Sequence, residues 1–167
     1  FKSIIIFCST KKKIQRLVGA LQRKGLNVEG ISSDYEQSER EKILLQFKAR
    51  KTRILVATDV LSRGIDIKDI DLVINYDVPN DAEDYVHRVG RTARAAAKGM
   101  AVTFVSSEEI YKFKRIETFV DRVYEKLSAP EQLGESPKWD EPNNKGRGHG
   151  RRHLAHAASK SAEHGIG

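Results

Sequence analysis

The chain has 167 residues, of which 39% are apolar, and a formal net charge of +7. This length and apolar content predict one compact domain with a tail. A single cysteine, Cys8, excludes an internal disulfide, and no run reaches the roughly 18 apolar residues of a membrane span. We therefore expect a soluble, cytoplasmic protein without a membrane anchor. The chain opens on an apolar run and its only methionine is Met100, which indicates a fragment.

Short apolar runs alternate with amphipathic segments along the chain. The runs predict buried strands at 3–9, 28–32, 53–58, 72–76 and 100–105, with 123–127 as a candidate sixth strand. One segment between them has apolar residues on one face of a predicted helix that ends at Gly25. A capping box of Ser106 and Glu109 predicts the start of another helix. This alternation predicts an α/β fold, a doubly wound and mostly parallel sheet with helices on both faces. Ligands of such sheets bind beyond the carboxyl ends of the strands, where 9–10, 58–59 and the helix after 81 would gather.

The predicted helix at 37–47 carries an arginine on the side that should be apolar. Asp34 and Gln37 form a plausible capping box for this helix. On a helical wheel, Arg40 lies within about 60° of the apolar residues Ile43, Leu44 and Phe47. Arg40 would either lay its stem along the edge of the core, pair with Asp34, or bind an anion.

Two polar segments follow the predicted strand at 53–58. The first is Thr58-Asp59, and the second is Arg63-Gly64-Ile65-Asp66. Spacing alone allows a simple explanation, in which Thr58 and Asp59 cap a short turn that Gly64 ends. Both segments would nevertheless lie at the carboxyl edge of the sheet.

The most informative segment is 85–94, which places three arginines and a histidine within eight residues. Asp81 is the expected N-cap of a helix that leads into it, with Gly90 as its possible end. The cations are His87, Arg88, Arg91 and Arg94. They would form either a solvated basic face or an anion site. Arginine favours the anion, because its planar fork matches phosphate oxygens bidentately, so the leading ligand is a polyphosphate.

This segment resembles motif VI, His-Arg-x-Gly-Arg-x-x-Arg, of the DEAD-box RNA helicases, which are ATPases built from two RecA-like domains. Three further segments match motifs of that family in the same order. Residues 4–10 resemble motif IV, 37–40 the Gln-x-x-Arg element, and 57–66 motif V with its Arg-Gly-x-Asp extension. The resemblance covers about residues 1–127 and implies a C-terminal RecA-like domain at 1–128.

The resemblance implies half of an ATP site. The residues expected at ATP are Gly64, Asp66, Arg91 and Arg94. Asp66 would accept a hydrogen bond from a ribose hydroxyl, and the two arginines would be catalytic arginine fingers. The chain has neither a Gly-x-x-x-x-Gly-Lys-[Ser/Thr] loop nor an Asp-Glu-Ala-Asp sequence. The phosphate cradle and the Mg²⁺ ligands are therefore expected on an N-terminal RecA-like domain, and this fragment alone is predicted to be inactive.

The resemblance also implies an RNA-binding surface. Backbone phosphates of a single strand or short duplex would be contacted by Thr10, Arg40 and Thr58. Asp59 would hold the motif VI side chains, and the other residues expected to support the motifs are Gln37, Arg63, His87 and Arg88. We expect the fragment to be monomeric. The alternative function is a non-catalytic RNA-binding or regulatory module that kept the RecA-like fold.

The sequence departs from the family at two places, and its composition changes toward the C-terminus. Ser32-Ser33 stands where the family commonly has His-Gly, and Ala93 stands where it usually has glycine. The composition of residues 129–142 predicts a proline-containing extended strap that Leu133 and Trp139 hold against the domain. Residues 143–167 predict a disordered basic tail that raises RNA affinity, and their histidines lack the spacing of a metal site.

Overall fold

The computed structural model describes residues 1–59, 67, 69–92 and 99–139. The strands are β1 (Ile4–Phe7), β2 (Val28–Ile31), β3 (Ile54–Ala57), β4 (Leu72–Asn75) and β5 (Met100–Thr103). The helices are α1 (Lys11–Arg23), α2 (Gln37–Lys48), α4 (Ala82–Val89) and α5 (Ile110–Phe119), with short 3-10 turns η1 (Gly90–Thr92) and η2 (Glu131–Leu133). None of the helices in the described ranges combines the length and hydropathy that crossing a bilayer requires.

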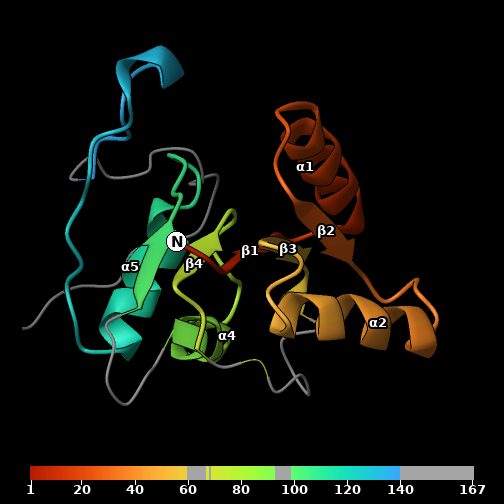
Figure 1. The fold of residues 1–167 in the computed structure, drawn as a ribbon. Coiled ribbons are helices and arrows are strands. Elements are labelled where there is room, and N and C mark those ends of the chain that lie inside the picture. Colours follow the sequence, from red (N-terminus) through yellow and green to blue (C-terminus); the bar gives the residue numbers. More distant parts are fainter. Residues whose placement is uncertain (60–66, 68, 93–98, 140–167) are drawn as a thin grey trace, which may run out of the picture.

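The five strands form one parallel sheet in the order β2-β3-β1-β4-β5 (Figure 1). The predicted α/β fold with a doubly wound parallel sheet is thus confirmed, although each strand is shorter than its apolar run. Because helices cover both faces of the sheet, the central strands β3, β1 and β4 are apolar without alternation.

The predicted sixth strand at 123–127 is wrong. Val123 and Leu127 point outward and are 84% and 75% exposed, whereas Tyr124 packs against the α4–α5 cluster. The Lys126 ammonium turns inward to pair with Glu117, and the Tyr124 N–H donates to the same carboxylate at 2.8 Å. The segment pairs with none of the described strands, and its contacts are with α4 and α5.

Helices α1 and α2 cover opposite faces of the sheet (Figure 1). Because successive strand residues face opposite sides, Ile5 and Phe7 of β1 pack on the α2 side, while Ile6 and the following Cys8 pack on the α1 side. Cys8 is fully buried, and burial raises the pKa of its thiol to about 12. The thiol therefore acts as a small apolar core group.

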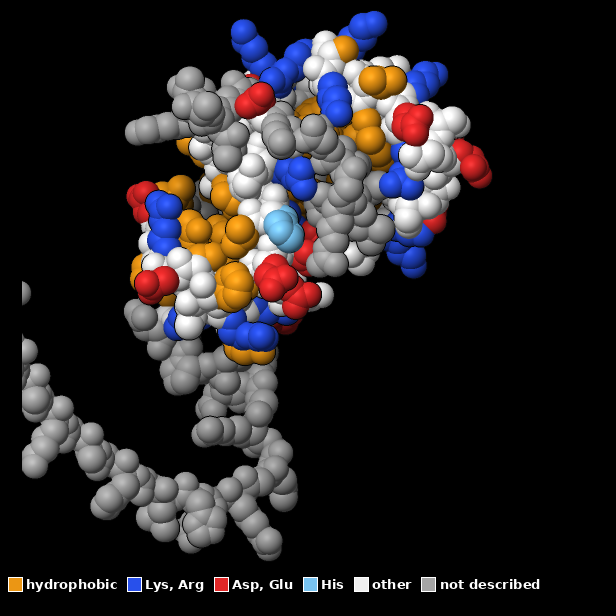
Figure 2. Space-filling model, turned by 90° about the horizontal axis from the view of Figure 1, so that it is seen from below, with side chains coloured by type: hydrophobic (Ala, Val, Ile, Leu, Met, Phe, Trp, Pro, Cys, Tyr) orange, Lys and Arg blue, Asp and Glu red, His pale blue; other side chains and the backbone are white. Residues whose placement is uncertain are grey.

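A third core cluster joins α4 to α5. The Tyr85 ring meets the Phe113 ring edge to face, with centroids 6.0 Å apart, and Trp139 packs on Phe113 at 5.9 Å. Trp139 thus packs against the domain, as predicted. Leu133 is 76% exposed, so its predicted pinning role is wrong. Seen from below, exposed hydrophobic side chains gather on the side where α4 and α5 lie, and charges of both signs surround them (Figure 2).

Helix α1 shows how local sequence fixes an element. The Thr10 hydroxyl caps its first turn by accepting from the Lys13 N–H at 3.3 Å. At its end, Gly25 adopts φ +75°, and the N–H groups of Gly25 and Leu26 donate to the carbonyls of Gln22 and Leu21. This paired arrangement is a Schellman motif, which needs a left-handed residue that glycine supplies without strain.

The other predicted caps are only partly realised. Helix α2 begins after Glu36 without a side-chain cap, so the predicted Asp34–Gln37 capping box is wrong. The Asp34 carboxylate instead pairs with the Lys11 ammonium of α1. Asp81 does precede α4, but its side chain makes no capping hydrogen bond. The Glu109 carboxylate accepts from the Ser106 hydroxyl at 2.9 Å in a turn that precedes α5.

We expect Gly30→Ala to lower the free energy of unfolding by about 1–3 kcal/mol. A Cβ at Gly30 of β2 would lie 2.7 Å from Ile14 Cγ2 and 2.9 Å from Val18 Cγ2, both close to the α1 backbone. The matched control is Gly19→Ala inside α1, where a Cβ meets only the Arg23 guanidinium at 3.5 Å. That change should stabilise by about 0.5–1 kcal/mol. Urea unfolding measures both, and equal effects would contradict the packing of α1 on β2.

Candidate functional site

The carboxyl ends of the strands bring the predicted motif residues to one edge of the sheet. Phe7 pairs with Ala57 on one side and with Asn75 on the other, so the residues that follow β1, β3 and β4 emerge together. The Cys8 N–H continues the ladder by donating to the Ala57 carbonyl at 2.9 Å. Thr10 and Thr58 follow β1 and β3 at this edge, as the sequence predicted.

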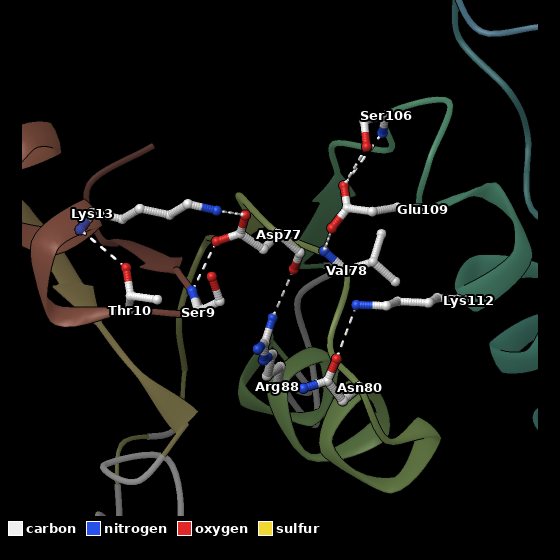
Figure 3. A network of polar contacts seen from close by, with 10 residues as sticks. All are labelled: Ser9, Thr10, Lys13, Asp77, Val78, Asn80, Arg88, Ser106, Glu109 and Lys112. Carbon is white, nitrogen blue, oxygen red and sulfur yellow. Dashed lines mark hydrogen bonds and ion pairs between the residues drawn. The ribbon is translucent and has the colours of Figure 1, made fainter. Parts of the chain in front are cut away.

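Arg88 is the most buried charged side chain at this edge, with 1% exposure. Its Nε and Nη2 groups donate to the two carboxylate oxygens of Asp59, at 2.5 and 2.6 Å. Its Nη1 group donates to Asn75 Oδ1 at 3.0 Å. The same group donates to the Asp77 carbonyl at 3.1 Å (Figure 3). The guanidinium also lies 5.1 Å from the centre of the Phe7 ring. One side chain from α4 thus connects the ends of β3 and β4.

The energetics of a buried guanidinium explain why so many acceptors surround it. A desolvated charge is costly unless it is paired and its N–H groups are satisfied. The bidentate carboxylate supplies the countercharge, and Asn75 is itself fixed because its amide donates to Thr103 Oγ1 at 3.0 Å. Arg88 therefore fixes the rotation and position of α4 relative to the sheet.

Asp77 forms a second polar centre beside Arg88, and sequence reasoning missed it. Its carboxylate accepts from the Ser9 N–H at 2.8 Å and pairs with the Lys13 ammonium of α1 (Figure 3). Burial alone would raise the pKa of Asp77, but the Lys13 and Ser9 hydrogen bonds outweigh it and lower that pKa. The hydrogen bond with Asp77 raises the pKa of Lys13. An aspartate directly after a buried strand was the available signal.

An open cavity of about 1010 Å³ lies beside these two centres. Its charged lining residues are Lys13, Asp59, Asp77, Arg88, Glu108, Glu109 and Lys112. Most of these charges already have partners in the domain, since Lys112 donates to Asn80 at 2.9 Å and Glu109 accepts from the Val78 N–H at 3.3 Å. The cavity wall is therefore a scaffold of mutually satisfied groups.

The basic run divides into one buried and two more accessible positions. Arg88 is buried, His87 on the same helix is exposed, and Arg91 is half-buried on η1. The helix ends near Gly90, as predicted, and the chain continues as the 3-10 turn η1. In this turn the Arg91 carbonyl accepts from the Ile70 N–H at 3.1 Å. The predicted residues Arg63, Gly64, Asp66 and Arg94 lie outside the described residues, as does Ala93.

Arg40 has an unusual environment. Its Nε atom is buried and has no hydrogen-bond partner within the part of the chain that the structure describes. Asp34, the partner that the sequence offered, is paired with Lys11 instead. Gln37, at the start of the same helix, donates to Glu41 at 2.8 Å and is exposed. A buried donor of this kind is costly until it meets an acceptor.

Comparison with known proteins identifies the family. Residues 1–96 match the model of the helicase conserved C-terminal domain. The chain belongs to this family. It is 40% identical over 125 residues to the ATP-dependent RNA helicase eIF4A of Kluyveromyces lactis, a match that covers 75% of this chain and 32% of the relative. The chain thus spans about a third of the length of this curated relative.

Solved structures of DEAD-box proteins agree with this assignment. A DEAD box protein from the hyperthermophile Methanococcus jannaschii is 42% identical, with a TM-score of 0.71, covering 75% of this chain and 34% of that one. Saccharomyces cerevisiae Dbp5 bound to RNA and ADP BeF3 is 34% identical, with a TM-score of 0.68, covering 73% of this chain and 33% of that one. By sequence and fold the molecule is a helicase C-terminal domain of the RecA-like type found in DEAD-box proteins, as the sequence resemblance predicted.

We expect Asp59→Asn in this DEAD-box domain to lower the free energy of unfolding by about 2–3 kcal/mol, because Arg88 would keep a buried charge without its countercharge. The matched control is Asp34→Asn, whose carboxylate is 64% exposed and pairs with a surface lysine. That change should cost less than about 1 kcal/mol. Thermal and urea unfolding of the two variants decide the matter, and equal losses would refute the anchoring role of Arg88.

Proposed function

We propose that this domain is the C-terminal half of an ATP-dependent RNA helicase whose ATPase site forms between it and an N-terminal RecA-like domain of the same protein. The observation that carries the proposal is the Arg88–Asp59 anchor, which holds α4 at the carboxyl edge of the sheet. Arg91 follows Arg88 by three residues on η1, so the anchor also positions Arg91. Support comes from relatives named as ATP-dependent RNA helicases and from a neighbour bound to RNA and ADP BeF3.

In this proposal the domain supplies positive charge to a phosphate chain held by the other domain. Phosphoryl transfer depends on positioning and on neutralising charge at the transferring group, and an arginine finger can contribute 10³–10⁵ in rate. We assign this role to Arg91 and Arg94, with Gly64 and Asp66 contacting the nucleotide. The Mg²⁺ ligands belong to the N-terminal domain in this proposal, because the Asp-Glu-Ala-Asp sequence is lacking here. Bound Mg²⁺ would neutralise phosphate charge.

We further propose that Thr10, Arg40 and Thr58 contact the RNA backbone. The Arg40 side chain has no acceptor among the described residues and is only partly buried, which supports this assignment over a purely structural arginine. Thr10 follows the end of β1 and Thr58 follows the end of β3, and these two strands are neighbours in the sheet. Phosphate contacts carry no sequence information, so this surface would bind RNA with little sequence preference.

The remaining parts of the chain have subordinate roles in the proposal. We divide it into the RecA-like domain at 1–128, a strap at 129–142 and a basic tail at 143–167 that adds nonspecific RNA affinity. Gln37, Asp59, Arg63, His87 and Arg88 support the motifs rather than touch the reacting groups. We also propose a monomeric fragment and a cytoplasmic protein, consistent with its single cysteine.

Arg91→Lys in the full-length protein should lower RNA-stimulated turnover at least about 10²-fold, which is roughly 2.7 kcal/mol of transition-state stabilisation. Lysine keeps the charge but loses the planar fork that binds two phosphate oxygens. The control is Arg115→Lys on the exposed face of α5, which should retain full turnover. Steady-state kinetics with saturating RNA measure both variants, and unchanged turnover for Arg91→Lys would remove the finger assignment.

Arg40→Ala should weaken RNA binding by the full-length protein similarly across sequences and make the salt dependence shallower by about one counterion. ATP affinity in the absence of RNA should stay unchanged. Arg115→Ala serves as the charge-matched control and should leave RNA affinity as it is. Fluorescence titrations at several salt concentrations would contradict the RNA assignment if Arg40→Ala and its control behave alike.

A further inference from the structure

Helix α1 carries an unusual charge pattern that the motifs do not explain. Residues 9–28 contain no aspartate or glutamate but six cations, namely Lys11, Lys12, Lys13, Arg16, Arg23 and Lys24. Two of the six are neutralised, since Lys11 pairs with Asp34 and Lys13 pairs with Asp77. The other four form no ion pair with any described residue. The helix therefore presents uncompensated positive charge.

Three of these cations form a line along the outer surface of α1. At about 100° per residue, Lys12, Arg16 and Arg23 fall within about 40° of one another, opposite the apolar stripe that packs on the sheet. All three side chains are exposed. The Arg23 guanidinium lies over Gly19, 3.5 Å from where a Cβ would stand, and so points back toward Arg16. We call Lys12, Arg16 and Arg23 the α1 stripe.

We propose that the α1 stripe binds the backbone of RNA beyond the segment contacted by Thr10, Arg40 and Thr58. This inference rests on the proposed RNA function. The helix begins directly after Thr10, so the stripe continues from one end of the proposed RNA surface. Lys12 and Arg23 are eleven positions apart, which corresponds to about 16 Å of helix, enough for several consecutive phosphates of a strand. The two arginines can each bind a phosphate bidentately.

The character of the surface favours a polyanion over the other partners that cations attract. No large hydrophobic side chain is exposed anywhere in α1, whereas protein interfaces have apolar, aromatic-rich centres. A helix lying on a membrane needs an apolar face for the bilayer, and the apolar face of α1 is buried against the sheet. The sugar-phosphate backbone of RNA can be bound through its charge alone, so it is the partner that suits this surface.

The test uses the full-length protein with Lys12, Arg16 and Arg23 all changed to glutamine. Two single-stranded RNAs serve as probes, one that fills only the motif-lined path and one longer by roughly ten nucleotides. The charge-matched control changes the exposed Lys114, Arg115 and Arg122 to glutamine at and just beyond α5. Thermal unfolding verifies that each variant is folded, and Arg40→Ala is measured in parallel.

The stripe variant should lose at least about 10-fold in affinity for the long RNA, and its salt slope should become shallower by about two, since each single-strand contact contributes about 0.7. Affinity for the short RNA should stay within about twofold, and the control should bind both RNAs normally. If the stripe variant binds the long RNA normally while Arg40→Ala is impaired, the stripe proposal fails and the proposed function stands. Equal losses on both RNAs would also overturn it. Unchanged RNA binding with lost binding to phosphatidylserine vesicles would assign the stripe to a membrane instead.

Discussion

The interaction on which this structure depends is the burial of the Arg88 guanidinium among acceptors from two strands. A guanidinium that is 1% exposed persists only if its charge and its N–H groups are compensated, and Asp59, Asn75 and the Asp77 carbonyl do this together. Asn75 is the last residue of β4, and Asp59 and Asp77 each lie two residues beyond the end of a strand. The sheet register therefore determines where Arg88 can lie, and Arg88 determines where α4 lies.

This constraint extends from α4 into the turn that carries Arg91. The Arg91 carbonyl is held by the Ile70 N–H, and the Thr92 hydroxyl donates to the Val89 carbonyl at 2.8 Å. Gly99 adds a further restraint, because a Cβ there would overlap the Thr92 side chain. Arginine fingers act through position, so a turn held from several sides suits the role that we propose for Arg91.

Sequence patterns predicted the core elements well, because buried parallel strands must be continuously apolar and α1 must be amphipathic. They failed where competition between polar partners decided the outcome. Asp34 could cap α2 or pair with Lys11, and only the tertiary fold brings Lys11 within reach. Residues 123–127 alternate in exposure like a strand, but Tyr124 packs against aromatic rings of α4 and α5 instead of a strand.

The candidate site was predictable to a similar extent. Motif order indicated that residues after β1 and β3 meet the basic helix, and strand register brings them to one edge. The Asp77–Lys13 pair was missed because its partners are 64 residues apart and neither lies in a motif. The unpartnered Nε of Arg40 likewise depends on burial, which a helical wheel cannot give.

The most direct test of the account is the exchange of the Arg88 Nε–H proton with water, measured by NMR on the ¹⁵N-labelled chain. Its bond to Asp59 and its burial predict a resolved signal that exchanges far more slowly than the Nε–H of exposed Arg16. The protection should disappear in Asp59→Asn while the fold persists. Exchange of Arg88 Nε–H as fast as that of Arg16 would show that the guanidinium is not anchored and would contradict the account.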